Sequence, residues 1–300
     1  EFIGHNIHFI CAEGNEMASS YVSNHNYTCD IVPQIELAER IVDFYPNVLI
    51  NDALDVSAEF MATMKKVGIK TVNFEDMGNG AEIADLVINA LYPHQLPKKN
   101  ILVGPSYFCL RDEFLHLSKL DKCKNPKRML LAFGGVDEGD LSNRVLNAVG
   151  SELTSRGIHL DIILGPGYKQ YEKLSSLGKE INEKYVNIVH TTQRISDYMS
   201  SADIAVTSGG RTVLELAAVG VPTIVICQND REMTHTFASS KNGILNLGHR
   251  KHVTNEMIYN QVIKVVEDPD LRKTMVSRSS EMDLRKGKKR TIEAILSLLK

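Results

Sequence analysis

The stretch Asp203–Asp230, DIAVTSGGRTVLELAAVGVPTIVICQND, decides the fold. An apolar strand ends at Thr207, the turn SGG follows, and an apolar helix begins near Arg211. The sequence GVP stops that helix in the usual way, with glycine and then proline after its last turn. The run TIVIC then predicts another strand. Strands that are apolar on both faces and alternate with helices are typical of a parallel sheet covered on both sides.

The same alternation runs along most of the chain. We expect strands at Asn6–Cys11, Val48–Asn51, Lys70–Phe74, Leu86–Asn89, Met129–Phe133, Leu160–Leu164, Val186–Val189, Ile204–Thr207 and Thr223–Cys227. We expect helices at Val56–Val67, Leu141–Leu153, Tyr168–Lys184, Arg211–Val219, Val253–Val266 and Ile292–Leu299, with another opened by Pro33. Strands that alternate with helices predict right-handed βαβ units and an α/β fold.

The chain has 300 residues, which suggests about two domains. The alternation pauses between Gly104 and Arg128, where the polar stretch KLDKCKNPKR occurs. We therefore expect two Rossmann-like domains, residues 1–125 and 126–300, with the last helix packing back on the first of them. Two such domains would hold a ligand in the cleft between them.

Composition excludes several classes of protein. The 43% hydrophobic content is ordinary for a globular protein, and no apolar run reaches the ~18 residues of a membrane-spanning helix. A net charge of −3 argues against a nucleic-acid binder. Five cysteines without a C-x-x-C pair favour a reducing compartment, the cytoplasm, and no metal or other cofactor.

Two glycine loops are the candidate ligand site. Glycines let backbone amides approach an anion closely, and the N-terminus of the next helix adds about half a positive charge. Gly209, Gly210, Arg211 and Thr212 form one loop, and Gly134 with Gly135, in AFGGVDEGD, form the other. Neither matches a P-loop or the dinucleotide fingerprint. A tight strand-to-helix turn explains either loop equally well.

Glu215 lies one turn into the helix that follows the first of these loops. A carboxylate there can accept both hydroxyls of a ribose. It can equally be a first-turn acid favoured by the helix dipole.

Other chemistry-bearing residues give weaker signals. His190 and His235 could assist proton transfer, although ordinary hydrogen bonding is the commoner fate of such histidines. Asp268-Pro269-Asp270 matches a D-x-D metal motif but reads as a turn. The basic run Arg285–Arg290 reads as a solvated turn before the last helix.

The segments quoted above resemble a known family. ADIAVTSGGRTVLELAAVGVPTI with CQN, LVGPSYFCLRDEF, LLAFGGVDEGD and DLRKGKKR are similar to GT-B-type UDP-sugar hydrolases of pseudaminic acid biosynthesis and to spore-coat polysaccharide proteins. They also resemble a module fused to CMP-sialic acid synthetases and, more distantly, the peptidoglycan GlcNAc transferases. The resemblance implies a GT-B architecture and a UDP-sugar substrate. Charge and composition, as stated above, predict no nucleic-acid partner and no stable insertion in a membrane. It also implies a fusion or functional partner in sialic-like acid synthesis.

The resemblance also implies roles for individual residues. Both glycine loops would hold the diphosphate, Glu215 the ribose and Ile195 the uracil. Asn229, beside the sugar, and His235, weakly, are the catalytic candidates. Further positions near the sugar or the cleft are Asp52, Glu75, Asp76, Tyr107, Arg111 and Gln228.

One departure from the family concerns catalysis. Relatives carry G-x-G-H-x-x-R after their first strand, with the His as general base, whereas GHNIHFI at residues 4–10 resembles a later junction. We therefore expect the first strand and the catalytic loop to be missing, which would leave unpaired strand edges. The expected activity is release of UDP from a deoxy-acetamido sugar nucleotide. The alternatives are an inverting UDP-GlcNAc-type glycosyltransferase and a non-catalytic nucleotide-sugar-binding module.

Overall fold

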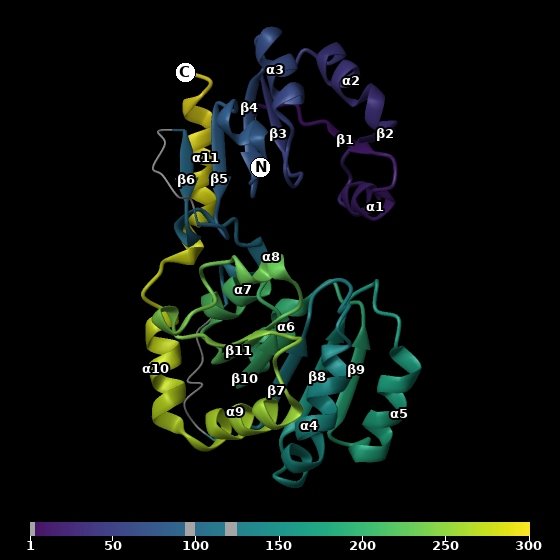
Figure 1. Ribbon diagram of the computed structural model, residues 1–300, viewed down its shortest axis with the longest axis vertical. Helices are drawn as coiled ribbons and strands as arrows, with labels where there is room; N and C mark the ends of the chain where they lie inside the picture. The colour runs from purple at the N-terminus through teal and green to yellow at the C-terminus, as the bar shows by residue number, and fades with distance from the viewer. Residues whose placement is uncertain (1–3, 94–99, 118–124) are drawn as a thin grey trace. The chain divides into compact units, whose positions relative to one another are not determined.

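The computed structural model describes residues 4–93, 100–117 and 125–300 (Figure 1). The described residues form two compact units. The first takes its residues from Glu1–Ile88, Lys98–Leu102 and Ala294–Lys300, and the second from Asn89–Pro97 and Val103–Glu293. The segment 118–124, next to the predicted domain boundary, lies outside the described residues, and that boundary stays a prediction.

The second unit contains a six-stranded sheet in the order β12-β11-β10-β7-β8-β9. Its strands are β7 (Arg128–Ala132), β8 (His159–Leu164), β9 (Val186–His190), β10 (Ile204–Thr207), β11 (Thr223–Cys227) and β12 (Leu245–His249). All of its pairings are parallel. From β7 the chain winds outward to β9, then returns to β10 on the other side of β7 and winds outward to β12. The carboxyl ends of β7 and β10 therefore form a topological switch point.

Successive side chains of these strands point to opposite faces of the sheet and pack in two different cores. Both faces of the sheet are therefore buried, as is typical of parallel sheets. Leu130 of β7 packs in the cluster that contains the apolar side of α7 (Thr212–Val219). Its neighbour Leu131 packs in the cluster that contains the apolar sides of α4 (Leu141–Ser155) and α9 (Asn255–Glu267). The remaining helices of this unit are α5 (Tyr171–Asn182), α6 (Ile195–Ser201), α8 (Asp230–Met233) and α10 (Pro269–Ser279). The helix α11 (Gly287–Ser297) has residues in both units.

The first unit contains two separate sheets. The strands β1 (Phe9–Ala12) and β2 (Cys29–Val32) form a parallel pair. The second sheet has the order β3-β4-β5-β6, with β3 (Val48–Asn51), β4 (Lys70–Phe74), β5 (Leu86–Asn89) and β6 (Ile101–Val103). Three helices accompany them, α1 (Glu16–Asn24), α2 (Leu37–Asp43) and α3 (Ala58–Lys66).

The edges of β1 and β3 are unpaired among the described residues, because β1 bonds only to β2 and β3 only to β4. No residue of β1 or β3 is fully buried, whereas all four residues of β5 are. Ile10 of β1 and Leu49 of β3 nevertheless pack against the same small core around Met64. β1 and β3 are therefore edge strands in this part of the chain, and the expected loss of a first strand stays a prediction.

The α/β fold class with parallel sheets is confirmed. Some element predictions were wrong in detail: β1 begins at Phe9, not Asn6, and α11 begins at Gly287, not Ile292. The basic run is therefore not a turn, since its last four residues lie in the first turn of α11. Six elements were not predicted from the sequence: α1, β2, β6, α6, β12 and α10. None of the helices in the described ranges combines the length and the apolar character needed to cross a membrane.

Candidate functional site

The switch point of the second unit brings the two glycine loops together. Ala132, the last residue of β7, pairs with Thr207, the last residue of β10. The Thr207 hydroxyl also donates a hydrogen bond to the Ala132 carbonyl at 2.5 Å. Each strand runs directly into its glycine loop, so the two loops start side by side. Ligands of open α/β sheets bind at this position.

The loop between β10 and α7 leaves backbone donors unpaired. Among the residues that the structure describes, the amides of Gly210, Arg211 and Thr212 have no hydrogen-bond partner. They lie at the N-terminus of α7, where the helix dipole is positive. The Arg211 side chain is exposed, with its guanidinium 5.6 Å from the centre of the Phe108 ring. This loop can therefore bind an anion.

The loop after β7 is arranged differently. The buried Asp137 carboxylate accepts hydrogen bonds from the amides of Leu141 and Ser142, at 2.8 and 2.9 Å, at the N-terminus of α4. Burial raises the pKa of Asp137, and these amide bonds oppose the rise. The first two amides of α4 are thus already satisfied within the chain. Gly134 and Gly135 pack instead against Gly165, where a Cβ would lie 2.4 Å from the Gly134 carbonyl oxygen.

Glu215 forms an ion pair that the sequence did not reveal. Its carboxylate lies 2.8 Å from Nε of Arg111, and Arg111 also contacts Glu113 at 2.8 Å. Burial raises the pKa of Glu215, while the nearby Arg111 and Arg211 lower it. Two residues that were predicted separately, Glu215 and Arg111, are therefore brought together. The ribose role of Glu215 stays a prediction.

The loop after β11 links both glycine loops. Glu232, which the sequence analysis missed, accepts hydrogen bonds from the amides of Gly209 and Gln228 at 3.0 and 2.7 Å. The Gln228 side chain donates to the Phe133 carbonyl at 2.7 Å, next to the other glycine loop. The Asn229 side chain caps α8 by accepting from the Glu232 amide. The sequence could not reveal the role of Glu232, because Gly209, one of its two partners, lies in another loop.

His235 is held against the same loop. Its Nδ1 donates to the Gly209 carbonyl at 2.8 Å, while its buried Nε2 has no partner among the described atoms. Burial lowers the pKa of His235 and favours the neutral ring. The ring of Tyr92 meets His235 edge to face at 4.8 Å, and Arg231 hydrogen-bonds the Tyr92 hydroxyl. A neutral imidazole with a vacant ring nitrogen can accept a proton.

Several predicted residues lie elsewhere. His190 ends β9, an edge strand three places from β10, and its ring lies 5.9 Å from that of Tyr171. Ile195 is the first residue of α6 and packs against the core that contains α7. The Tyr107 carbonyl accepts a hydrogen bond from Thr291.

Three predicted acids belong to the first unit. Asp52 is exposed after β3, whereas Glu75 and Asp76 are buried. Asp76 accepts hydrogen bonds from the Val56 and Gly78 amides at 3.1 and 2.8 Å. These bonds stabilise the backbone around Asp76.

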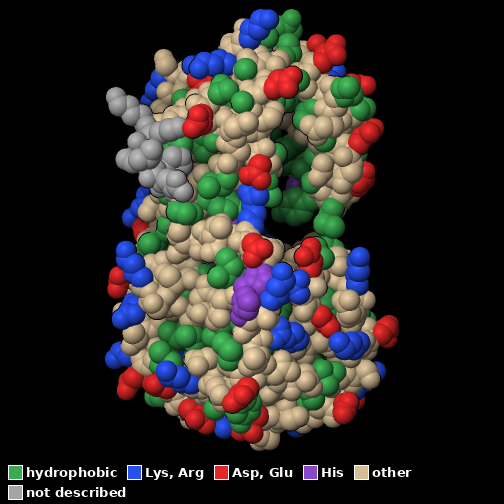
Figure 2. Space-filling model, viewed as in Figure 1, with side chains coloured by type: hydrophobic (Ala, Val, Ile, Leu, Met, Phe, Trp, Pro, Cys, Tyr) green, Lys and Arg blue, Asp and Glu red, His purple; other side chains and the backbone are tan. Residues whose placement is uncertain are grey.

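Neither the D-x-D motif nor the basic run forms a site of its own. Asp268 caps α10 by accepting from the Leu271 amide, so the motif is a helix junction, not a free turn. The part of the chain that the structure describes has no group of three His, Cys, Asp or Glu that could hold a metal. In the basic run, Lys288 pairs with Asp112 at 2.6 Å and Lys286 with Asp283 at 2.9 Å. Figure 2 shows acidic and basic side chains interspersed over the visible face.

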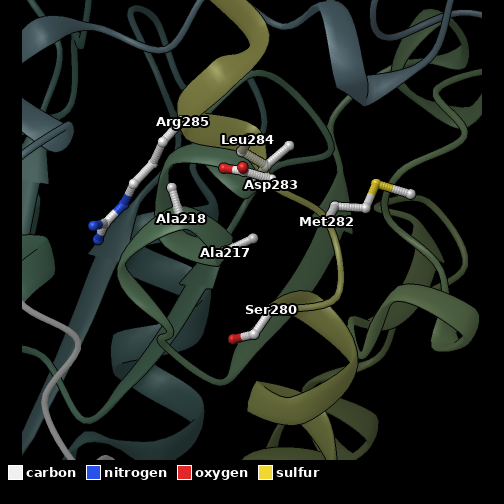
Figure 3. A pocket seen from close by; sticks show the side chains of 7 residues that line it. All are labelled: Ala217, Ala218, Ser280, Met282, Asp283, Leu284 and Arg285. Carbon is white, nitrogen blue, oxygen red and sulfur yellow. The ribbon is translucent and has the colours of Figure 1, made fainter.

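The second unit also has a small cavity of about 230 Å³. Figure 3 shows that it lies between the end of α7, with Ala217 and Ala218, and the segment that follows α10. Arg285 borders this cavity and donates a hydrogen bond to the Leu117 carbonyl at 2.6 Å. Asp283 is the one acid in the lining, and Lys286 lowers its pKa. The cavity was not predicted from the sequence.

Residues 129–291 match the model of the glycosyltransferase family 28 C-terminal domain. The chain belongs to this family. The match begins in β7 and ends in α11, so it includes both glycine loops, Glu215 and Glu232. The family 28 match places the chain among glycosyltransferase-like proteins.

Three proteins with similar sequences add to the family 28 match. The chain is 27% identical over 210 residues to the uncharacterised protein MJ1062 of Methanocaldococcus jannaschii, covering 65% of this chain but only 43% of MJ1062. It is 24% identical over 275 residues to the spore coat polysaccharide biosynthesis protein SpsG of Bacillus subtilis, covering 86% of this chain and 80% of SpsG. It is also 24% identical over 172 residues to a Finegoldia magna transferase, covering 55% of this chain and 45% of the relative. That relative is named as a UDP-N-acetylglucosamine–N-acetylmuramyl-(pentapeptide) pyrophosphoryl-undecaprenol N-acetylglucosamine transferase.

Solved structures show the same fold. MurG of Acinetobacter baumannii matches with a TM-score of 0.70 at 14% identity, covering 94% of this chain and 88% of MurG. HepE of Anabaena, solved in complex with UDP, matches with a TM-score of 0.61 at 11% identity, covering 94% and 89% of the two chains. The GT-B-like fold expected from the sequence is thereby confirmed.

Proposed function

We propose that the second unit binds the UDP group of a UDP-activated sugar, and that the protein acts on this sugar in glycan biosynthesis. The observation that carries the proposal is the row of three unpaired amides, Gly210–Thr212, at the N-terminus of α7. A helix N-terminus with unpaired amides is suited to phosphate oxygens. Family 28 membership, the transferase relative and the UDP complex of HepE support the same ligand class.

Neighbouring residues have complementary roles in this proposal. Arg211 adds a positive charge beside the diphosphate, and Glu215 accepts the ribose hydroxyls. Because Glu215 is already paired with Arg111 at 2.8 Å, ribose binding exchanges or shares that contact. Gly134 and Gly135 form the opposite wall, and Ile195 contacts the uracil. Asn229 and His235 lie nearest to the reacting end of the ligand.

The finer proposal is hydrolysis of a deoxy-acetamido sugar nucleotide. Water attacks C1 of the sugar, the bond from C1 to the diphosphate oxygen breaks, and UDP leaves with the electron pair. The amides of Gly210–Thr212 stabilise the charge that develops on the leaving diphosphate. A base must take the proton from water, and no G-x-G-H-x-x-R loop occurs in the printed sequence. Hydrolysis is supported by the resemblance that extends to spore-coat proteins, of which SpsG is one.

Transfer of the sugar to an acceptor is the second candidate. It is favoured by the family 28 match and by the named activity of the Finegoldia magna relative. In this reaction a hydroxyl of the acceptor replaces water as the nucleophile at C1. The leaving group, UDP, and the anion site that binds it are the same in transfer and in hydrolysis.

Titration calorimetry with UDP tests the shared part of the proposal. We expect saturable binding, and absence of binding at millimolar UDP would overturn it. Incubation of UDP-GlcNAc and of UDP-deoxy-acetamido sugars with and without a polyprenyl or glycan acceptor then separates the two reactions. Free sugar in both incubations indicates hydrolysis, and product only with acceptor indicates transfer. UDP binding with no turnover indicates a nucleotide-sugar-binding module.

A further inference from the structure

Glu232 places a negative charge against the anion-binding loop. Its Oε2 accepts hydrogen bonds from the amides of Gly209 and Gln228, at 3.0 and 2.7 Å. Its Oε1 lies on the side of Gly210, 3.7 Å from where a Cβ of that residue would be. The first amide of the glycine loop is thus occupied by this carboxylate, and the next three amides remain for a ligand.

Neighbouring groups hold Glu232 in this position. The Asn229 side chain caps the Glu232 amide at 3.0 Å, and His235 binds the carbonyl of Gly209 at 2.8 Å. The N–H and the C=O of Gly209 are therefore both hydrogen-bonded, the N–H to Glu232 and the C=O to His235. No Lys or Arg forms an ion pair with Glu232 among the described residues. Its charge therefore acts on any anion bound at Gly210–Thr212.

The charge of that anion depends on its chemical form. A terminal phosphate monoester has a second pKa near 6 and is almost doubly ionised at pH 7.5. A phosphate esterified on both sides, as in a nucleotide sugar, carries one charge. A fixed carboxylate a few ångströms away repels the doubly charged monoester more strongly than the singly charged diester. Specificity arises from such a repulsive element as readily as from an attractive contact.

We propose that Glu232 makes this site prefer a diphosphate esterified at its far end over a free nucleoside diphosphate. The inference rests on the proposed function, because it assumes that the loop holds the diphosphate. It makes Glu232 a specificity-determining residue that acts through charge.

The test compares UDP with its β-methyl ester, which removes one charge and adds no sugar. For the unaltered protein we expect the methyl ester to bind about tenfold more tightly than UDP at pH 7.5. In Glu232→Gln, whose amide oxygen can still accept from Gly209 and Gln228, we expect this ratio to fall to about one or below, because Arg211 and the loop amides attract the additional charge of UDP. Calorimetry measures both dissociation constants, and circular dichroism checks folding.

Two further variants separate charge from position. Glu232→Asp keeps the charge but shortens the side chain, so both ligands should weaken while their ratio is retained. Asp230→Asn removes a charge from the same short helix, but that side chain is 97% exposed, so the ratio should not change.

The outcomes are distinguishable from those of the proposed function. Equal affinity of UDP and its methyl ester for the unaltered protein overturns the inference but leaves UDP binding intact. An undiminished ratio in folded Glu232→Gln also overturns it. Failure of both ligands to bind the unaltered protein overturns the proposed function and this inference together.

Discussion

Replacement of Gly209 by alanine should destabilise the second unit, although the change adds a single methyl group. A Cβ at this position would lie 2.9 Å from the Cys227 sulfur, 3.2 Å from Cβ of Glu232 and 3.3 Å from the Glu232 carbonyl oxygen. Cys227 is completely buried at the end of β11, so it cannot swing away. Overpacking of this kind typically destabilises a protein by about 2 kcal/mol. For a unit of this size that corresponds to a fall in Tm of roughly 4–8 °C.

Gly210→Ala is the matched control. A Cβ there has its nearest neighbours at 3.7 and 3.8 Å, which is ordinary contact, so its Tm should change by less than about 2 °C. The added methyl group does stand beside the unpaired amides, so UDP binding should weaken in Gly210→Ala without loss of stability. Thermal unfolding followed by circular dichroism measures the first effect and calorimetry the second. Equal Tm values for the two variants would refute the packing argument.

Two other outcomes follow from the buried acids. Burial raises the pKa of Asp137 in the folded protein. The stability that protonated Asp137 contributes is therefore fully present below the ordinary aspartate pKa of about 3.9. It is lost as the pH rises through the higher pKa of the folded protein. Asp137→Asn lacks this titrating group, so its free energy of unfolding minus that of the unaltered protein should increase between pH 4 and pH 7. Urea denaturation measures both free energies, and a difference that stays constant with pH would contradict this. Glu215→Ala should weaken UDP binding about tenfold and leave 2′,3′-dideoxy-UDP unaffected in calorimetry. A similar loss for both nucleotides would show that Glu215 does not bind the ribose.

The region around β10 and α7 was predictable because its signals are local. Four successive buried residues mark β10, and the sequence GVP ends α7 where the structure ends it, with Gly220 in the left-handed conformation. The prediction of α7 differs from the observed helix by one residue. The helix α1 gave no signal because Ser19 is its one fully buried residue, so no apolar periodicity exists to be read.

The partners of the site residues could not be predicted. Arg111 and Glu215 are 104 positions apart in the chain, and Glu232 reaches Gly209 across 23. Each of these contacts depends on how strands order themselves in a sheet, and a single sequence carries no direct signal for that order. Asp137 shows the same limit at shorter range. The glycines beside it suggested an anion site, but its own carboxylate accepts hydrogen bonds from the first two α4 amides.

The pairing of β7 with β10 also has a consequence for folding. Thr207 and Ala132, which meet at the switch point, are separated by 75 positions, and the whole of β8, β9 and their helices lies between them. Contacts of such long sequence separation form slowly. Until this central pair forms, the loops after β7, β10 and β11 are unconnected segments without a common binding surface. Nucleotide binding would therefore report completed folding of the second unit, and a bound nucleotide would stabilise the whole sheet against unfolding by mass action.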